Sequence, residues 1–74
     1  MTYKRLLTTL VLLKDKYIYN IFDINDNKYI KTNIYSLDDF SNLVEKIYYI
    51  NSCDFIIDYN KNKLTIKING IKNN

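Results

Sequence analysis

The chain contains a single glycine, Gly70, and no proline, so its turns must be built from other residues. Asparagine and aspartate tolerate the left-handed backbone conformation and hydrogen-bond their own main chain, which makes them suitable turn formers. They cluster between apolar or aromatic runs of strand length at three places: Lys14 to Lys16, Asn25 to Asn27 and Asn60 to Asn62. Runs separated by short turns of this kind are typical of β-hairpins.

Five β-strands are predicted from the runs that these turns separate. The expected strands cover Arg5 to Leu13, Tyr17 to Ile24, Lys28 to Tyr35, Asp54 to Tyr59 and Lys63 to Ile68. The first run is apolar at both alternating sets of positions, whereas a strand with one solvated face alternates between apolar and polar residues. We therefore expect the first strand to lie at the centre of a sheet, covered on both faces.

One helix is predicted between the third and fourth strands. Ser36 is a suitable N-cap, because its hydroxyl can accept a hydrogen bond from a free N–H of the first turn. Asp38 and Asp39 follow it, where negative charge complements the positive end of the helix dipole. The apolar residues then recur at the i, i+3, i+4 and i+7 spacing of one helical face. They are Leu37, Phe40, Leu43, Val44, Ile47 and Tyr48.

The expected fold is a single α+β domain over residues 1–74 with the element order βββαββ. Joining both hairpins through the first strand gives an antiparallel five-stranded sheet in the order 3-2-1-5-4, with the helix packed on one face. The second face must then be covered by something else or stay partly exposed. A chain of this size without disulfides or a metal-ligand set has a modest core. We therefore expect a homodimer.

Residue usage bears on location and origin. Cys53 is the only cysteine, so no intramolecular disulfide can form, and a reducing, cytoplasmic compartment is expected. The basic and apolar start of the chain imitates a secretory signal, but no small-residue cleavage site follows, so neither a signal peptide nor a membrane segment is predicted. Ile, Lys, Asn and Tyr supply 41 of the 74 residues, while Ala and Pro are absent. This bias indicates A/T-rich coding DNA, as in many low-GC bacteria, their phages and plasmids, and some large viruses.

Catalytic chemistry is not expected of this sequence. It contains no histidine, one glutamate and one cysteine, so the usual sets of acid, base and nucleophile cannot be assembled. A phosphate-binding loop needs several glycines, and only Gly70 is present. Asp54 and Asp58 share a strand face and could offer a cation site, but oxygen-only sites need roughly six ligands, so solvated strand residues explain them better. We predict a non-enzymatic protein without catalytic residues, metal or cofactor.

The main functional candidate is a predicted sheet face rich in tyrosine and lysine. If the apolar residues of the strands point at the helix, period-two alternation brings a set of binding candidates to the opposite side. They are Tyr17, Tyr19, Tyr29, Lys31, Tyr35 and Lys67. These tyrosines could anchor a protein partner or stack on single-stranded nucleic acid, with the lysines meeting phosphates. The plainer explanation is a solvated face in a tyrosine-rich sequence, because tyrosine has high β-propensity.

Charge favours a protein partner over nucleic acid. The net charge is +3, but the lysines are dispersed and Arg5 is the only arginine, whereas nucleic-acid modules carry dense basic stripes. In gross character, a tiny cofactor-free chain of A/T-type composition resembles the small accessory proteins of phages and mobile elements, including anti-CRISPR inhibitors of host defence. That resemblance implies a host protein or complex as the partner and carries no specific residue. We expect an inhibitory protein-binding module, with single-stranded nucleic-acid binding as the alternative.

Overall fold

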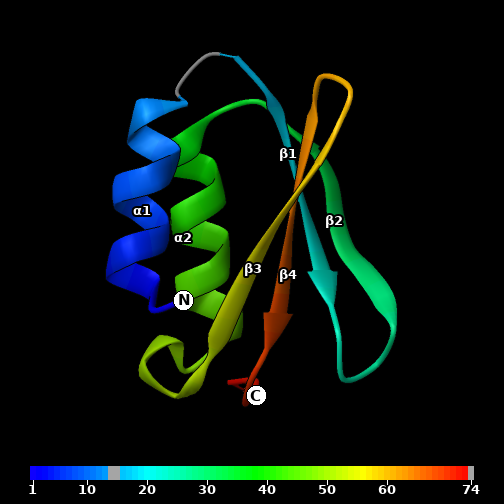
Figure 1. The fold of residues 1–74 in the computed structure, drawn as a ribbon. Coiled ribbons are helices and arrows are strands. Elements are labelled where there is room, and N and C mark those ends of the chain that lie inside the picture. Colours follow the sequence, from blue (N-terminus) through cyan, green and yellow to red (C-terminus); the bar gives the residue numbers. More distant parts are fainter. Residues whose placement is uncertain (14–15, 74) are drawn as a thin grey trace.

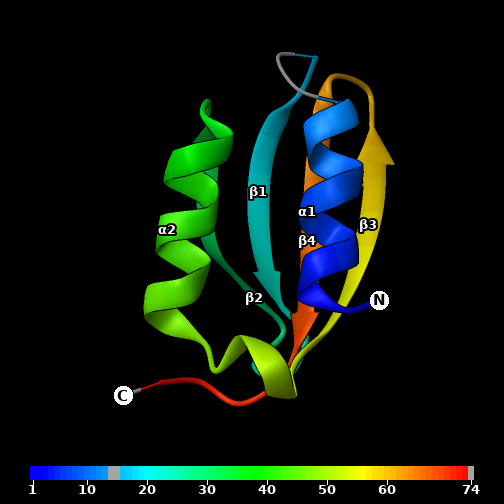
Figure 2. The same ribbon diagram turned by 90° about the vertical axis from the view of Figure 1, so that its left-hand side faces the viewer.

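Two helices lie side by side on one face of a four-stranded sheet, as the views in Figure 1 and Figure 2 show. The computed structural model describes residues 1–13 and 16–73. A short 3-10 helix, η1, follows the second helix. The elements in chain order are α1 (Tyr3–Leu12), β1 (Ile18–Asp23), β2 (Lys28–Ile34), α2 (Leu37–Ile47), η1 (Ile50–Ser52), β3 (Asp54–Asn60) and β4 (Lys63–Asn69).

The first helix, α1, corrects the prediction of a strand over Arg5 to Leu13. Its inward face carries Tyr3, Leu6 and Leu10, which are buried and follow the i, i+3, i+7 spacing of a helix. Leu12 is 76% exposed, although a strand would have placed it on the same face as Leu10. The leucines that made this run apolar on both sides of a strand are thus divided by a helix into a buried set and an exposed set.

Local hydrogen bonds support α1 at its start and along its exposed side. The Thr2 hydroxyl caps the helix by accepting a hydrogen bond from the Arg5 N–H at 3.3 Å. The hydroxyls of Thr8 and Thr9 donate to the carbonyl oxygens of Lys4 and Arg5, one turn earlier, at 3.0 and 2.9 Å. These bonds satisfy the hydroxyls of two β-branched residues that by propensity favour a strand.

The sheet order is β2-β1-β4-β3, with two antiparallel hairpins and a parallel central pair. In that central pair, Tyr19 lies opposite Leu64 and Ile21 lies opposite Ile66. The prediction of an antiparallel five-stranded sheet in the order 3-2-1-5-4 with one helix is therefore wrong. Removing the predicted first strand from that order leaves the observed order of the other strands, so the error lies in the segment that forms α1.

The second helix, α2, forms where a helix was predicted. The Ser36 hydroxyl accepts a hydrogen bond from the Asp39 N–H at 3.3 Å, and Asp38 and Asp39 occupy the first turn. Phe40 and Val44 are fully buried against the sheet. The cap, the acidic first turn and the apolar stripe all depend on residues close together in the sequence, which is why the pattern identified this helix.

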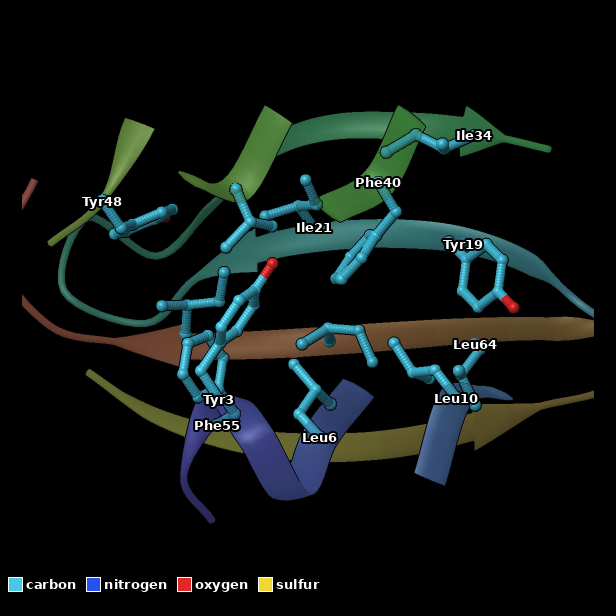
Figure 3. Packing of buried hydrophobic residues seen from close by; sticks show 13 residues of the cluster. Tyr3, Leu6, Leu10, Tyr19, Ile21, Ile34, Phe40, Tyr48, Phe55 and Leu64 are labelled. Atoms are coloured by element: carbon cyan, nitrogen blue, oxygen red, sulfur yellow. The ribbon is translucent and has the colours of Figure 1, made fainter. Parts of the chain in front are cut away.

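The hydrophobic core lies between the helices and the sheet (Figure 3). Phe40 of α2 contacts Tyr19 of β1, with ring centroids 5.6 Å apart, and Tyr3 of α1 contacts Phe55 of β3 at 5.5 Å. The buried hydrophobic residues are Tyr3, Leu6, Leu10, Tyr19, Ile21, Ile34, Phe40, Val44, Tyr48, Phe55, Leu64, Ile66 and Ile68. Both helices contribute to this one core, so both are committed to the same face of the sheet.

Left-handed residues occur in both hairpin turns and in one edge strand. Asn27 has a φ of 52° in the β1–β2 turn, and Lys61 has a φ of 57° in the β3–β4 turn. Turns were predicted at both places, while residues 14 and 15 of the other predicted turn lie outside the described residues. Asn33, with a φ of 59°, lies inside β2, whose pairing with β1 has two register irregularities. Such irregularities are typical of a bulged edge strand.

Replacing Leu10 and Leu12 by alanine distinguishes a helix from a strand. Leu10 is fully buried, so Leu10→Ala should lower the free energy of unfolding by about 2 to 5 kcal/mol. Leu12 is 76% exposed, so Leu12→Ala should change it by no more than about 0.5 kcal/mol. Urea denaturation followed by circular dichroism measures both values. Similar losses in the two variants would contradict α1, because a strand places both side chains on one face.

Candidate binding surface

Among the described residues, no helix or strand covers the face of the sheet opposite α1 and α2, and we call it the open face (Figure 1). Ile21 of β1 and Ile66 of β4 are fully buried under the helices. Successive side chains of a strand point to opposite faces, so the next residues along these strands, Phe22 and Lys67, point to the open face. Both are partly exposed there.

One row of directly paired residues crosses all four strands on the open face. Tyr29 lies opposite Phe22, Phe22 opposite Lys67, and Lys67 opposite Ile56. The rings of Phe22 and Tyr29 meet edge to face, with centroids 5.0 Å apart and planes at 77°. Tyr29 is 56% exposed and Ile56 is 48% exposed. We call these four residues the open-face row, and it combines apolar area with one positive charge.

A second, polar row lies beside the open-face row. Asn20 pairs with Thr65, and Thr65 pairs with Asp58. Asn20 is 5% exposed, and its side-chain oxygen accepts a hydrogen bond from the Asn33 N–H at 3.0 Å, which fixes the irregular part of β2. A shallow hollow of about 340 Å³ opens here, lined by Asn20, Tyr29, Thr32, Asn33, Asn60, Lys63 and Thr65. The open face therefore offers amide and hydroxyl groups next to its aromatic pair.

Charges of both signs lie on the open face. The Lys67 ammonium is 3.4 Å from Oδ2 of Asp58, in a partly exposed ion pair, and Lys63 follows on the same side of β4. Asp54 is 2.6 Å from the amino group of Met1, and this hydrogen bond and positive charge hold the pKa of Asp54 below its usual value. Each of these two carboxylates therefore has a cation beside it, Lys67 for Asp58 and the Met1 amine for Asp54.

The predicted binding residues do not share one face. The structure brings Tyr29 and Lys67 together in the open-face row. Tyr19 is only 1% exposed and belongs to the core between the sheet and the helices. Tyr17 is partly buried against the same core, where its ring meets that of Tyr59 edge to face at 5.7 Å. Tyr19 in β1 and Tyr17 just before β1 therefore point away from the open face.

The remaining two predicted residues lie apart from the open-face row. Lys31 pairs with the core residue Ile21, between the two register irregularities of β2, and is exposed at the sheet edge. Tyr35 is 74% exposed in the link between β2 and α2. Their positions follow from the irregular course of β2, which a strict two-residue alternation does not describe.

Sequence reasoning missed Phe22, Ile56 and Asn20, which the structure places on the open face. Apolar strand residues such as Phe22 were expected to point at the helix, and neither Ile56 nor Asn20 was among the predicted binding residues. For Phe22, the position of the hairpin turn could have predicted its pairing with Tyr29. The turn at Asn25 to Asn27 sets Asp23 opposite Lys28, and the next residues outward, Phe22 and Tyr29, face each other.

Ionisable residues gather at a second place, the end of β1. Asp23 is fully buried and forms an ion pair with Lys72 from the C-terminal segment. The same ammonium is 2.6 Å from Oδ2 of Asp26, and this hydrogen bond holds the pKa of Asp26 below its usual value. Hydrogen bonds to Asp23 first and to Asp26 second raise the pKa of Lys72. A lowered carboxyl pKa stabilises the fold above the ordinary value of about 4, and this contribution is lost as the pH falls through the lowered pKa.

Backbone contacts hold the same C-terminal segment in place. The Tyr49 N–H donates to the Ile71 carbonyl at 3.0 Å, and the side-chain amide of Asn25 donates to the Gly70 carbonyl at 2.9 Å.

Gly70 lies so close to Cys53 that an added Cβ would overlap both the thiol and the Cα of that cysteine. Burial raises the pKa of the Cys53 thiol, which keeps it in the less reactive protonated form. The close approach explains the single glycine of the chain.

The cluster at the end of β1 is arranged as a structural tie. Burial and the nearby charge of Asp23 raise the pKa of Tyr48 to about 12, so its phenol stays protonated at neutral pH. The carboxylates of Asp23 and Asp26 share the Lys72 ammonium, an arrangement that offsets the cost of burying Asp23. In the part of the chain that the structure describes, no three His, Cys, Asp or Glu residues are grouped as metal ligands.

Comparison with known proteins leaves this surface as the main guide to function. No known protein family matches the chain, and no characterised protein or solved structure matches it either. Neither helix, nor any other in the described ranges, has the length and apolarity required to cross a membrane.

Lys72→Gln should lower the melting temperature much more than Lys67→Gln. The first change leaves the carboxylate of Asp23 buried without its cation, which is strongly destabilising. The second removes a partly exposed pair with Asp58, and such surface pairs contribute about 0 to 1 kcal/mol. Thermal unfolding at neutral pH measures both. Equal melting temperatures would mean that Asp23 does not depend on Lys72.

Proposed function

We propose that this protein is a non-enzymatic binding module that engages a protein partner through its open face. The observation that carries the proposal is the open-face row, formed by Tyr29, Phe22, Lys67 and Ile56. Where one face of a sheet meets water, polar side chains are expected at these positions. Three of the four are aromatic or aliphatic, and a rimmed apolar strip of this kind is typical of an interaction site.

Tyr29 and Phe22 are the proposed anchors. An aromatic ring buries a large area at a low cost in rotamer entropy, and tyrosine is enriched among the residues that dominate binding energies. The edge-to-face contact with Phe22 at 5.0 Å holds the Tyr29 ring in position before a partner arrives. The Lys67–Asp58 pair lies beside these rings and can set the orientation of a partner through complementary charge.

The distribution of charge favours a protein over nucleic acid as the partner. Phosphate backbones require uncompensated positive charge along the path of the strand. On the open face, Lys67 is already paired with Asp58 at 3.4 Å. Arg5, the only arginine, belongs to α1 on the opposite side of the sheet. Single-stranded nucleic acid, stacking on Tyr29 and Phe22, is the alternative ligand.

A small chain of A/T-type composition resembles the accessory proteins of phages and mobile elements, and we propose that this one inhibits a host protein or complex by occupying its surface. The cytoplasm is the proposed compartment, because Cys53 is a free thiol that a reducing environment preserves. Inhibition by occlusion requires a stable surface and no catalytic group, in agreement with the paired and stacked residues of the open face.

Tyr29→Ala tests the proposed surface, with Tyr49→Ala as a matched control. The two tyrosines are 56% and 54% exposed, but Tyr49 precedes η1 at the end of α2 and is outside the open-face row. Each immobilised variant is incubated with nuclease-treated lysate of the source cells. We expect a protein that the wild type and Tyr49→Ala retain and Tyr29→Ala loses, with an affinity loss of about 2 kcal/mol or more once it is purified. Equal retention by all three would contradict the proposal.

A labelled single-stranded oligonucleotide tests the alternative. If the open face binds nucleic acid, the logarithm of the affinity should fall linearly with the logarithm of the salt concentration, and Tyr29→Ala should cost about 1 to 3 kcal/mol. We expect no saturable binding of oligo-dT or oligo-U at physiological salt, as measured by fluorescence anisotropy. Saturable, salt-dependent binding that Tyr29→Ala abolishes would replace the protein partner by nucleic acid.

A further inference from the structure

The two edges of the sheet differ in how well they resist pairing with another strand. On β2, two register irregularities and the left-handed Asn33 interrupt the edge, and Lys28 and Lys31 are exposed along it. Bulges and edge lysines are devices that prevent strand addition. On β3, every residue from Asp54 to Asn60 pairs with β4 in unbroken register. The outer side of β3 is therefore the regular edge of the sheet.

Only the first part of the β3 edge has a partner among the described residues. The Met1 amine donates to the Phe55 carbonyl at 2.9 Å, and the Phe55 N–H donates to the Met1 carbonyl at 3.0 Å. In an antiparallel strand, alternate residues direct both of their backbone groups to the same side. Ile57 and Tyr59 therefore direct their N–H and C=O groups to the same edge as Phe55, beyond the reach of Met1.

We propose that β3 pairs with β3 of a second copy of this chain, in antiparallel orientation about a twofold axis at Asp58. Ile57 of each copy then exchanges backbone hydrogen bonds with Tyr59 of the other, and the two sheets become one continuous sheet. The same patch on both copies forms the contact, as twofold symmetry requires. This inference concerns the edge of the sheet and does not depend on the partner of the open face.

The contacts of Met1 select this register. If Ile57 faced Ile57 of the second copy, Phe55 would face Tyr59, and its hydrogen bonds to Met1 would have to break. With Ile57 facing Tyr59, Phe55 falls opposite Lys61, which has a φ of 57° and belongs to the turn after β3. Because the chain turns toward β4 at Lys61, no strand of the second copy replaces Met1 beside Phe55. The outward N–H and C=O groups of Ile57 and Tyr59 are then paired in both copies.

The side chains fit a second copy and limit its affinity. Ile57 is partly buried and Tyr59 is 52% exposed, and an aliphatic residue opposite an aromatic one is a favourable cross-strand pair that the twofold axis repeats. The axis also places Asp58 opposite Asp58, which is unfavourable. In each copy, Lys67 lies 3.4 Å from the Asp58 of its own chain and reduces that repulsion. The expected product is a dimer that forms reversibly as the concentration rises.

Amide hydrogen exchange of the wild-type protein, followed by NMR from low micromolar to near-millimolar concentration, tests the pairing. The N–H groups of Ile56 and Asp58 point to β4 and should be protected at every concentration. Those of Ile57 and Tyr59 should gain protection as the concentration rises, while sedimentation shows the mass increasing from 8.9 kDa toward twice that value. Unchanged exchange at Ile57 and Tyr59, with a monomer mass at the highest concentration, would overturn the proposal.

Tyr59→Pro and Tyr59→Ala form a matched pair of variants. Proline removes the outward N–H, whereas alanine removes only the ring, and neither change touches a hydrogen bond to β4. Tyr59→Pro should abolish the dimer, and Tyr59→Ala should weaken it by a smaller factor. Asp58→Asn should strengthen it severalfold, because the like charges at the axis disappear. A Tyr59→Pro protein that dimerises as well as Tyr59→Ala, or an Asp58→Asn protein that dimerises less than the wild type, would overturn the pairing.

Discussion

The parallel pairing of β1 with β4 is the constraint on which the rest of this small fold depends. Parallel neighbours cannot be joined by a tight turn, so the chain between them must cross over the sheet, and it carries β2, α2 and β3 on the way. The central pairs of Tyr19 with Leu64 and Ile21 with Ile66 then form the floor on which both helices pack. Because the single core uses both helices, the opposite face is left to the side chains of the strands alone.

Helix α2 and the two hairpins were predictable, because their signals lie in residues close together in the sequence. Helix α1 was not, because its apolar residues fit both a strand period and a helix period. Ser36 and the acidic residues after it mark α2, and short Asn-rich turns mark both hairpins. In the segment that forms α1, the leucines are dense enough to satisfy both a two-residue and a helical period. Packing decides between them, because Leu6 and Leu10 are buried in the core shared with the sheet and α2 while Leu12 is exposed. Once this segment leaves the sheet, the remaining strands keep the order that was predicted for them.

The candidate surface was predictable only in part, because β1 carries apolar residues on both of its faces. Ile18 and Phe22 alternate with Tyr19 and Ile21, so hydrophobicity alone does not say which set meets the helices. Strand β4 settles the question, because its apolar residues Leu64, Ile66 and Ile68 are buried and alternate with polar residues. The β1 residues paired with them must lie on the same face of the sheet. Pairing between strands distant in sequence therefore determines which aromatic residues are free to bind.

Strand β3 supplies both proposed surfaces without competition between them. Ile56 and Asp58 direct their side chains to the open face, whereas Ile57 and Tyr59 direct their backbone groups along the plane of the sheet. Side chains stand perpendicular to the sheet and hydrogen bonds lie within it, so a second copy at this edge leaves the open face accessible. The doubled sheet would present two open-face rows related by the twofold axis, with Tyr29 near each outer end. Two linked copies of one surface bind a partner with repeated sites more strongly than either copy alone, because the second contact is intramolecular. Self-association at the edge would thus strengthen binding on the face without adding any contact to that face.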